Sequence, residues 1–228
     1  MQLPRPVAAA LALAGLAAAI ATGSAAAATP AATGTDATCR STDTVASTGW
    51  AGLRAPATDG ALTFTGVIDY VARAEGTSAW LSIGGGGHTL DIIQIGIHDC
   101  GTGPRYFAAW GSGTPGAAGS SYEEIDLGEA DLKAHSFSIA LADETWRLGI
   151  DGRTVRSIDD GFRTWKIGWI QSMAESHTAQ MPGVKVSRLA ETQGSTAMSP
   201  TFGYSRVGAA ALSARMTVAR TGFTVAAR

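Results

Sequence analysis

The chain has 228 residues, a formal net charge of −2 and only 16% charged side chains. This balance argues against a nucleic-acid-binding protein, which presents a basic surface, and the sequence has no basic amphipathic helix that would bind a membrane surface. The low charge together with 29 glycines is typical of a β-rich extracellular protein with many tight turns.

The N-terminal segment has the pattern of a secretory signal peptide. Arg5 precedes an unbroken apolar run, Val7–Ile20, and small residues follow, so we expect cleavage after Ala28. A transmembrane anchor is the alternative, but the run is short for a bilayer and no basic cluster follows it. No later segment is long and apolar enough to cross a membrane. We therefore predict a secreted protein with a signal peptide over residues 1–28, a disordered lead-in over 29–38 and no membrane association after cleavage.

Two cysteines, Cys39 and Cys100, remain in the exported chain. An even number of cysteines in a secreted protein predicts a disulfide. It would close a loop of about 60 residues and contribute roughly 4 kcal/mol in the chain-entropy model. Two separate thiols are the alternative. A metal site is less favoured, because neither cysteine has a close Cys or His partner at zinc-finger spacing.

After residue 39, alternation of apolar and polar residues is frequent and helical periodicity is scarce. Leu62–Arg73 is the longest alternating run, and Gly111–Ser121 has the composition of a loop. The Asp151-Gly152 pair predicts a tight hairpin turn. Ala209–Val218 has a weak helical pattern. The other expected strands cover residues 78–83, 89–98, 105–110, 122–127, 135–141, 144–150, 154–158, 164–176, 184–189, 201–207 and 223–226.

About ten short strands with turns every eight to twelve residues indicate an all-β fold, a two-sheet antiparallel β-sandwich or jelly roll, rather than a parallel α/β sheet. The chain is long enough for one sizeable core. We expect one domain over residues 39–190. Residues 191–228 are expected to form C-terminal strands or an extension of the same domain.

The strand Thr89–His98 carries an amide among apolar side chains. Because side chains alternate between the two faces of a strand, Gln94 shares a face with Leu90, Ile92 and His98. A buried amide without partners costs on the order of 1–3 kcal/mol. Gln94 is therefore either a fully hydrogen-bonded core residue or a residue that lines a cleft.

The segment Trp165–Gly183 has a mixed aromatic and polar face. The residues that share this face are Trp165, Ile167, Trp169, Gln171, Met173, Glu175 and His177. Aromatic side chains with a few polar groups are typical of a binding surface. A carboxylate beside apolar walls has a raised pKa and can serve as a general acid or base. The alternative is that Glu175 is a solvated residue at the end of a strand.

Common catalytic and metal-binding signatures are missing. The sequence has no G-x-S-x-G, H-E-x-x-H or P-loop motif. Gly84–Gly87 is interpreted as a flexible turn, because a phosphate cradle needs the N-terminus of a helix behind it. Three histidines on one face would suffice for a metal ion, but the four in this chain are scattered, which favours surface positions. We expect no metal and no cofactor.

Six short segments, taken together and in order, carry a family resemblance. They are Ser47–Gly52 (STGWAG), Ala79–Gly84 (AWLSIG), Ile92–Gly96 (IIQIG), Tyr106–Trp110 (YFAAW), Asp131–Ile150 and Glu175–Gly183 (ESHTAQMPG). They resemble, in turn, the N-W-x-G element, the A-W-V-G-I-G strand, the I-L-Q-T-G strand, the Y-x-A-W strand, the later hairpin and the G-E-x-H-x-x-x-Q-M-P-G pattern of the glutamic peptidases. These are the eqolisin family and its neprosin-type relatives.

The resemblance implies a concanavalin-like jelly roll and hydrolysis of peptide bonds in acid, without a cofactor. It makes Glu175 the general base that activates water and then protonates the leaving amine, and Gln94 the donor to the oxyanion. The implied substrate-binding residues are Trp50, Trp80, Trp169, Gln171 and His177. The implied partner is a polypeptide substrate or an extracellular polymer, bound by a monomer.

The register of the later strand leaves two interpretations open. If the strand is anchored on its aromatic-Ile pair, Gln171 occupies the catalytic position, and Glu175 lies roughly 13 Å further along the same face. If it is anchored on Glu-x-His and Gln-Met-Pro-Gly, Glu175 occupies that position. The first register leaves the chain without a general base, because an amide cannot take a proton from water.

The alternative function is a non-catalytic extracellular binding domain on the same jelly-roll scaffold. Trp50, Trp80, Trp110 and Trp169 would then stack on sugar rings or clasp a peptide. An exposed row of coplanar indoles would favour a carbohydrate platform, whereas buried indoles would exclude it. A structural cell-surface protein without a small ligand is a third possibility.

Overall fold

The computed structural model describes residues 49–57, 62–72, 75–177, 183–198, 200–208, 216–219 and 221–225. All of them belong to one compact unit, which spans residues 32–228. The expected signal peptide, the lead-in and Cys39 lie outside the described residues. The predicted disulfide between Cys39 and Cys100 therefore stays a prediction.

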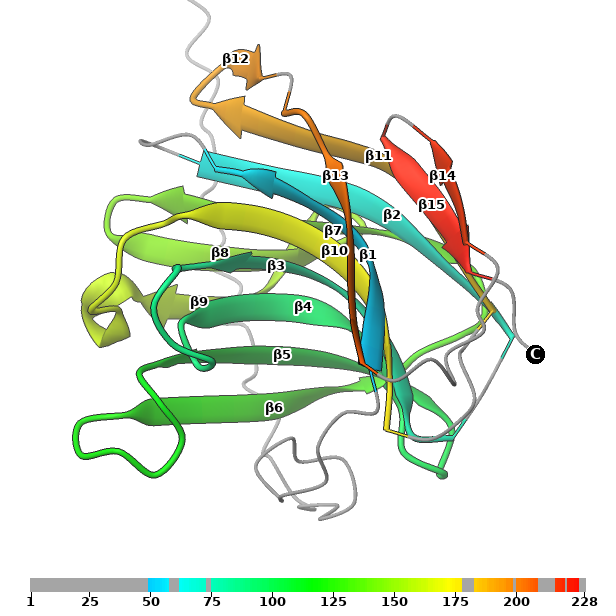
Figure 1. Ribbon diagram of the computed structural model, residues 1–228, viewed down its shortest axis with the longest axis horizontal. Helices are drawn as coiled ribbons and strands as arrows, with labels where there is room; N and C mark the ends of the chain where they lie inside the picture. The colour runs from blue at the N-terminus through cyan, green and yellow to red at the C-terminus, as the bar shows by residue number, and fades with distance from the viewer. Residues whose placement is uncertain are drawn as a thin grey trace, which may run out of the picture. The chain divides into compact units, whose positions relative to one another are not determined.

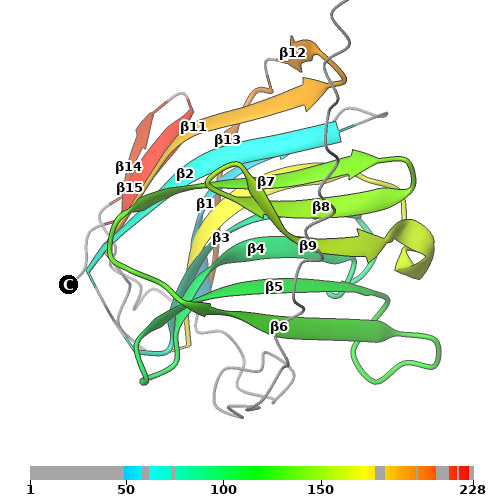
Figure 2. The same cartoon turned by 180° about the vertical axis from the view of Figure 1, so that it is seen from behind.

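The described strands form two antiparallel sheets that lie face to face (Figure 1; Figure 2 shows the opposite side). Sheet A has the order β13-β1-β10-β3-β4-β5-β6. Its strands are β1 (Gly49–Pro56), β3 (Thr77–Gly84), β4 (Ile92–Asp99), β5 (Pro104–Ser112), β6 (Ser121–Glu129), β10 (Trp169–Ser176) and β13 (Gly203–Gly208).

Sheet B has the order β14-β15-β11-β2-β7-β8-β9, and β12 pairs with β11. Its strands are β2 (Leu62–Ala72), β7 (Ala134–Ala142), β8 (Thr145–Ile150), β9 (Arg153–Asp159), β11 (Gly183–Gln193), β12 (Thr196–Met198), β14 (Met216–Ala219) and β15 (Gly222–Val225). A short 3₁₀ helix, η1 (Asp160–Phe162), follows β9. The all-β sandwich predicted from the alternating pattern is thereby confirmed.

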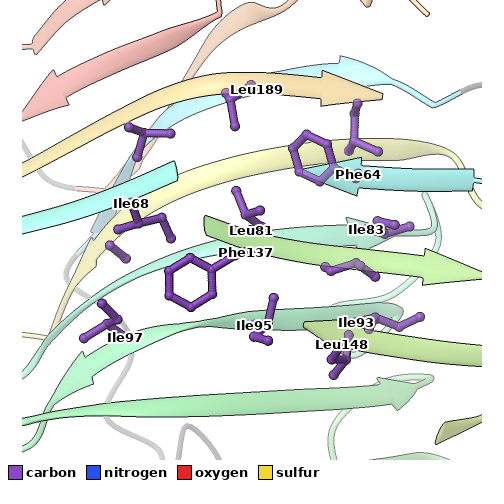
Figure 3. Close-up of a cluster of buried hydrophobic side chains, with 14 of the residues drawn as sticks. Phe64, Ile68, Leu81, Ile83, Ile93, Ile95, Ile97, Phe137, Leu148 and Leu189 are labelled. Atoms are coloured by element: carbon purple, nitrogen blue, oxygen red, sulfur yellow. The ribbon is translucent and has the colours of Figure 1, made fainter. Parts of the chain in front are cut away.

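The core lies between the sheets and is built from one side of each strand. Sheet A contributes every second residue of its central strands, for example Leu81 and Ile83 in β3 and Ile95 in β4, all of which are inaccessible to solvent. Figure 3 shows these side chains meeting Phe64 and Phe137 from sheet B. Burying a large apolar side chain stabilises a fold by about 1.5–3 kcal/mol, so this layer fixes which face of each strand points inward.

Two segments differ from the strand pattern expected from the sequence. The predicted strand 164–176 begins only at Trp169, because the side chain of Trp165 donates a hydrogen bond (3.0 Å) to the carbonyl oxygen of Gly111 and holds the preceding segment outside the sheet. The weak helical pattern over Ala209–Val218 is wrong in its described part, because residues 216–219 form β14.

Candidate functional site

The side of sheet A that points away from sheet B carries the predicted site residues, and we call it the site face. Strand alternation requires this placement. In β3, Ala79 and Leu81 enter the core, so Ser78, Trp80 and Ser82 point to the opposite side. A small apolar cluster of Trp80, Phe107, Ala109 and Met173 forms the middle of the site face, with Trp50 and Tyr122 packed against it.

The strand registers arrange the polar side chains of the site face in two rows. The first, which we call the amide row, crosses six strands and consists of Arg54 (β1), Gln171 (β10), Ser82 (β3), Gln94 (β4), Ala109 (β5) and Glu124 (β6). The second, the Glu175 row, consists of Trp50 (β1), Glu175 (β10), Ser78 (β3), His98 (β4) and Arg105 (β5).

The carboxylate of Glu175 is held by the strand next to its own. Its Oε2 accepts a hydrogen bond from Nε1 of Trp80 (3.0 Å) and a longer one from Oγ of Ser78 (3.5 Å). Nε2 of His177 lies 3.8 Å from the other oxygen, Oε1. The side chain keeps 19% of its surface exposed, so the carboxylate is ordered and still reachable from solvent. It is turned towards β3, the strand that separates β10 from β4.

Two amides face each other across Ser82 in the amide row. Gln171 is 8% exposed, and its Nε2 lies 3.5 Å from Oγ of Ser82, at the limit of a hydrogen bond. Gln94 lies on the other side of Ser82 and is half-buried. Of the two residues that the sequence offered for the catalytic position, Gln171 is therefore in the same row as Gln94, and Glu175 is four residues further along β10.

Gln94 and Glu175 lie on one face of one sheet, displaced along a diagonal. Two strand spacings and four residues along the strand separate their Cα atoms by roughly 16 Å on a flat sheet. The same diagonal step leads from Glu124 on β6 to His98 on β4, and there Oε1 and Nδ1 are 3.9 Å apart. Side chains related by this step can thus reach each other across the site face.

The tryptophans expected to line a cleft take different positions. Trp50 is half-buried opposite Glu175, whereas Trp80 is only 4% exposed and forms the floor between Gln94 and Glu175. Trp169 lies at the far end, where its Nε1 donates to the carbonyl of Gly85 and the guanidinium of Arg54 stacks 4.4 Å above its ring.

The indoles do not form an exposed coplanar row. Trp110, which the binding-domain interpretation counted among the stacking residues, points into the core and is 5% exposed. With Trp80 buried as well, a carbohydrate platform built from these four indoles is excluded.

His98 is a largely buried histidine, with 12% of its side chain exposed, that the mechanism implied by the resemblance does not use. Its ring stacks on Phe107 with the centroids 4.8 Å apart. Burial lowers the pKa of His98 to about 4; the charge of Asp126 opposes this shift, and that of Arg105 adds to it. His98 is therefore neutral near pH 7 in the folded protein.

The four histidines are not gathered at one place. His135 lies on sheet B with its ring against Tyr106, and its two ring nitrogens bond to Asp151 (2.7 Å) and Asp131 (2.6 Å). Burial lowers the pKa of His135, but the hydrogen bonds to these two carboxylates outweigh burial, so the pKa is raised overall. Within the described ranges, no group of three or more His, Cys, Asp and Glu side chains is arranged to hold a metal ion.

Several residues of the site face escaped the sequence analysis, chiefly Arg54, Tyr122 and Glu124. Oε2 of Glu124 accepts a hydrogen bond from the Tyr122 hydroxyl (2.7 Å), and the Glu124 side chain is 13% exposed. Both residues come from β6, an edge strand without clear alternation. Only the pairing of Ala109 with Glu124 shows that this carboxylate shares a row with Gln94.

A separate shallow cavity of about 400 Å³ lies on the outward side of sheet B. Charged residues of both signs line it, among them Asp69, Asp151, Lys185 and Arg188. It shares no residue with the site face. The described part of the chain contains no helix of the length and hydrophobicity needed to cross a membrane.

Comparison with known proteins gives a likeness of structure only. No family model matches the chain, and no curated protein gives a significant match. Scytalido-glutamic peptidase, solved with a transition-state analogue inhibitor, aligns with a TM-score of 0.55 at 12% identity, over 77% of this chain and 96% of that one. At this identity the likeness establishes the fold, and it agrees with the two-sheet sandwich seen here.

Two further solved structures align less well. SCP-B, a member of the eqolisin family solved with the tripeptide Ala-Ile-His, has a TM-score of 0.49 at 14% identity, over 77% of this chain and 96% of that one. A glycoside hydrolase family 16 endo-glucanase from Bacteroides ovatus has a TM-score of 0.41 at 13% identity, over 53% of this chain and 57% of that one.

Proposed function

We propose that the protein is a hydrolase similar to the glutamic peptidases, and that it cleaves peptide bonds in acid with Glu175 as general base and Gln94 as oxyanion donor. The observation that carries the proposal is the position of the Glu175 carboxylate. It lies on the same face as Gln94, is held by Trp80 and Ser78, and is turned towards the strand that separates the two residues.

In the proposed reaction, Glu175 takes a proton from a water molecule, whose oxygen attacks the carbonyl carbon of the scissile bond. The Gln94 side-chain N–H donates a hydrogen bond to the oxygen that becomes negative in the tetrahedral intermediate. The protonated Glu175 then gives its proton to the amide nitrogen as the C–N bond breaks. Trp80 and Ser78 act as positioning residues, because they orient the carboxylate through Oε2 and leave Oε1 facing His177 and solvent.

We also propose that the protein acts in the location and oligomeric state that the sequence predicts. The chain would be exported by the signal peptide over residues 1–28, stabilised by a disulfide between Cys39 and Cys100, and act outside the cell as a monomer on polypeptides. No metal or cofactor enters the proposed chemistry.

Cleavage of an unfolded protein substrate between pH 2 and pH 7 tests the proposal. The unmodified chain should cleave in acid, and Glu175→Gln and Gln94→Ala should each lower kcat by at least 100-fold, the usual cost of losing an acid-base group or an oxyanion donor. Glu123→Gln is the matched control, because Glu123 is an exposed carboxylate on β6 outside both rows. Circular dichroism should show that every variant is folded. Full activity in either site variant would refute the assignment.

The amide row favours a second candidate, a domain that binds polypeptides without cleaving them. Gln94 and Gln171 flank Ser82 symmetrically and offer hydrogen-bond donors and acceptors but no base. The variant Gln171→Glu separates the two candidates. If the unmodified chain binds peptides and does not cleave them, and Gln171→Glu gains acid-dependent cleavage, then Gln171 occupies the position of the general base and this chain is a binding domain.

A further inference from the structure

The cavity on the outward side of sheet B has a volume of about 400 Å³, within the range of pockets that bind small molecules. It lies over three neighbouring strands, β11, β2 and β7 (Figure 2). The strand registers arrange its lining as a grid of Val67 and Asp69 on β2, Ser187 and Lys185 opposite them on β11, and Ser136 and Ala134 opposite them on β7. The backbones of β11 and β7 are roughly 10 Å apart, which is wide enough for one sugar-sized ring.

Arg188 lines this cavity from a bulge in β11. The register of β11 against β2 shifts between Ser187 and Ala190, so Arg188 and Leu189 together lie opposite Gly66. Leu189 enters the core, where it occupies the space that a side chain at Gly66 would need. Arg188 stays exposed and has a φ of 55°. This left-handed backbone is unfavourable for any residue with a Cβ, and glycine is the usual residue at such a position.

The strain at Arg188 has no local structural reason. The other described non-glycine residues with a positive φ are in hairpin turns, at Asp143, Glu144 and Asp151, whereas Arg188 is inside a strand. Bulges re-aim side chains, and strain that a glycine would avoid is typical of functional positions. Arg188 forms no ion pair with any residue of the described chain. Its guanidinium is therefore held over the cavity and is available to an anion.

The other charges of the cavity are already compensated. Lys185 and Asp69 lie directly opposite each other on β11 and β2, so their charges offset each other. Asp151 is engaged through both oxygens, because Oδ2 bonds to a ring nitrogen of His135 (2.7 Å) and Oδ1 accepts a hydrogen bond from the backbone N–H of Ser136 (2.9 Å). The cavity thus offers one uncompensated positive charge, and the two carboxylates disfavour a ligand with more than one negative charge.

We propose that this cavity binds a hexuronate, a six-carbon sugar with one carboxylate, either free or as a unit of an acidic polysaccharide. Arg188 binds the carboxylate with two parallel hydrogen bonds. The hydroxyls of Ser187 and Ser136 and the carboxylate of Asp69 bond to the sugar hydroxyls, and half-buried Val67 supports the C–H groups of the ring. The site is separate from the site face, and the inference holds whether or not the chain cleaves peptides.

NMR titration of the ¹⁵N-labelled chain with sodium D-glucuronate at pH 5.5 in low salt tests the ligand class. Saturable shifts should be confined to the amides of residues 67–69, 134–136 and 185–188. Glucose lacks the carboxylate and acetate lacks the hydroxyls, so each should bind at least about tenfold more weakly. Glycine, a zwitterion, or inorganic phosphate binding here more tightly than glucuronate would overturn the assignment. A glucuronate-containing trisaccharide that binds more tightly than the monosaccharide identifies a polysaccharide as the source of the unit.

Substitutions of Arg188 separate a binding role from a structural one. Arg188→Gly removes the guanidinium and the backbone strain together, so glucuronate affinity should fall about tenfold while Tm stays the same or rises. Arg188→Gln, which keeps the strain, should lose the same affinity. Arg147→Gln is the control, because Arg147 is exposed on sheet B and does not line the cavity. Undiminished affinity in both Arg188 variants, or an equal loss in Arg147→Gln, would overturn the inference.

Discussion

Protonation of His98 should make the protein lose stability in acid. The ordinary pKa of histidine, about 6.5, applies to the unfolded chain, whereas burial lowers the pKa of His98 in the folded protein to about 4. Between these two values the unfolded state binds more protons than the folded state, so the free energy of unfolding falls as the pH falls. With about 1.4 kcal/mol for each pH unit, lowering the pH from 7 to 4 should remove about 3 kcal/mol through this residue.

The charged groups around His98 also shift its pKa and therefore influence the pH range over which stability is lost. Asp126 and Asp99 raise its pKa and Arg105 lowers it, but burial is the largest contribution. Arg105 and Ser78 flank the ring on the neighbouring strands, and Glu124 approaches it from β6. The free energy of unfolding of such a domain is only about 5–15 kcal/mol. A loss of this size is therefore a substantial fraction of it, in the pH range where the proposed hydrolase would work.

Urea unfolding at pH 4, 5, 6 and 7 measures the effect in the unmodified chain and in His98→Gln. The variant lacks the stacking on Phe107 and should be less stable at pH 7, but the gap should shrink by about 3 kcal/mol towards pH 4. His88→Gln, a change at an exposed histidine, should follow the unmodified chain. A gap between the unmodified chain and His98→Gln that does not change between pH 4 and pH 7 would refute the reasoning.

Three further predictions follow from single contacts. Trp80→Phe keeps a ring on the floor of the site face but removes the N–H that holds Glu175, so kcat in acid, measured well below the Tm of the variant, should fall about tenfold. An unchanged kcat would show that Trp80 does not position Glu175. Gly96→Ala should destabilise the fold by roughly 1–3 kcal/mol in urea unfolding, because its Cβ would overlap the carbonyl oxygen of Ala79 and lie 2.7 Å from the Cα of Trp80. His135→Asn should remove a contribution to stability that is present below pH 6.5 and is lost as the pH rises through the raised folded pKa; equal pH profiles of the variant and the unmodified chain would contradict this.

The fold, and the side of each strand on which the site residues lie, could be predicted, because both depend on the alternation of apolar and polar residues within single strands. The apolar positions of Thr77–Gly84 and Ile92–Asp99 point to the core, and this alone puts Gln94 on the outer side of its strand. The same parity joins Gln171 and Glu175 on one side of β10. These properties need no knowledge of which strands are neighbours.

The order of the strands and the rows across them could not be predicted, because pairing between distant segments leaves no local pattern. Nothing in the sequence near Glu124 indicates that it lies two strands from Gln94, since an edge strand buries little and shows weak alternation. The late start of β10 has a similar cause: Trp165 donates a hydrogen bond to the backbone carbonyl of Gly111 in β5, which is far away in the sequence, and this contact overrides the local strand propensity.

The pairing order of sheet A also determines when the site face can assemble during folding. Trp50, near the start of the described chain, pairs with Glu175 on one side and with Val207 on the other. The loops that must close before β1 has both neighbours are long, and long-range pairing of this kind slows folding. A nascent chain released before residue 208 would contain Gln94 but leave β1 as an unpaired edge, open to association with other chains. Synthesis of β13 is therefore the step that covers β1 and completes sheet A.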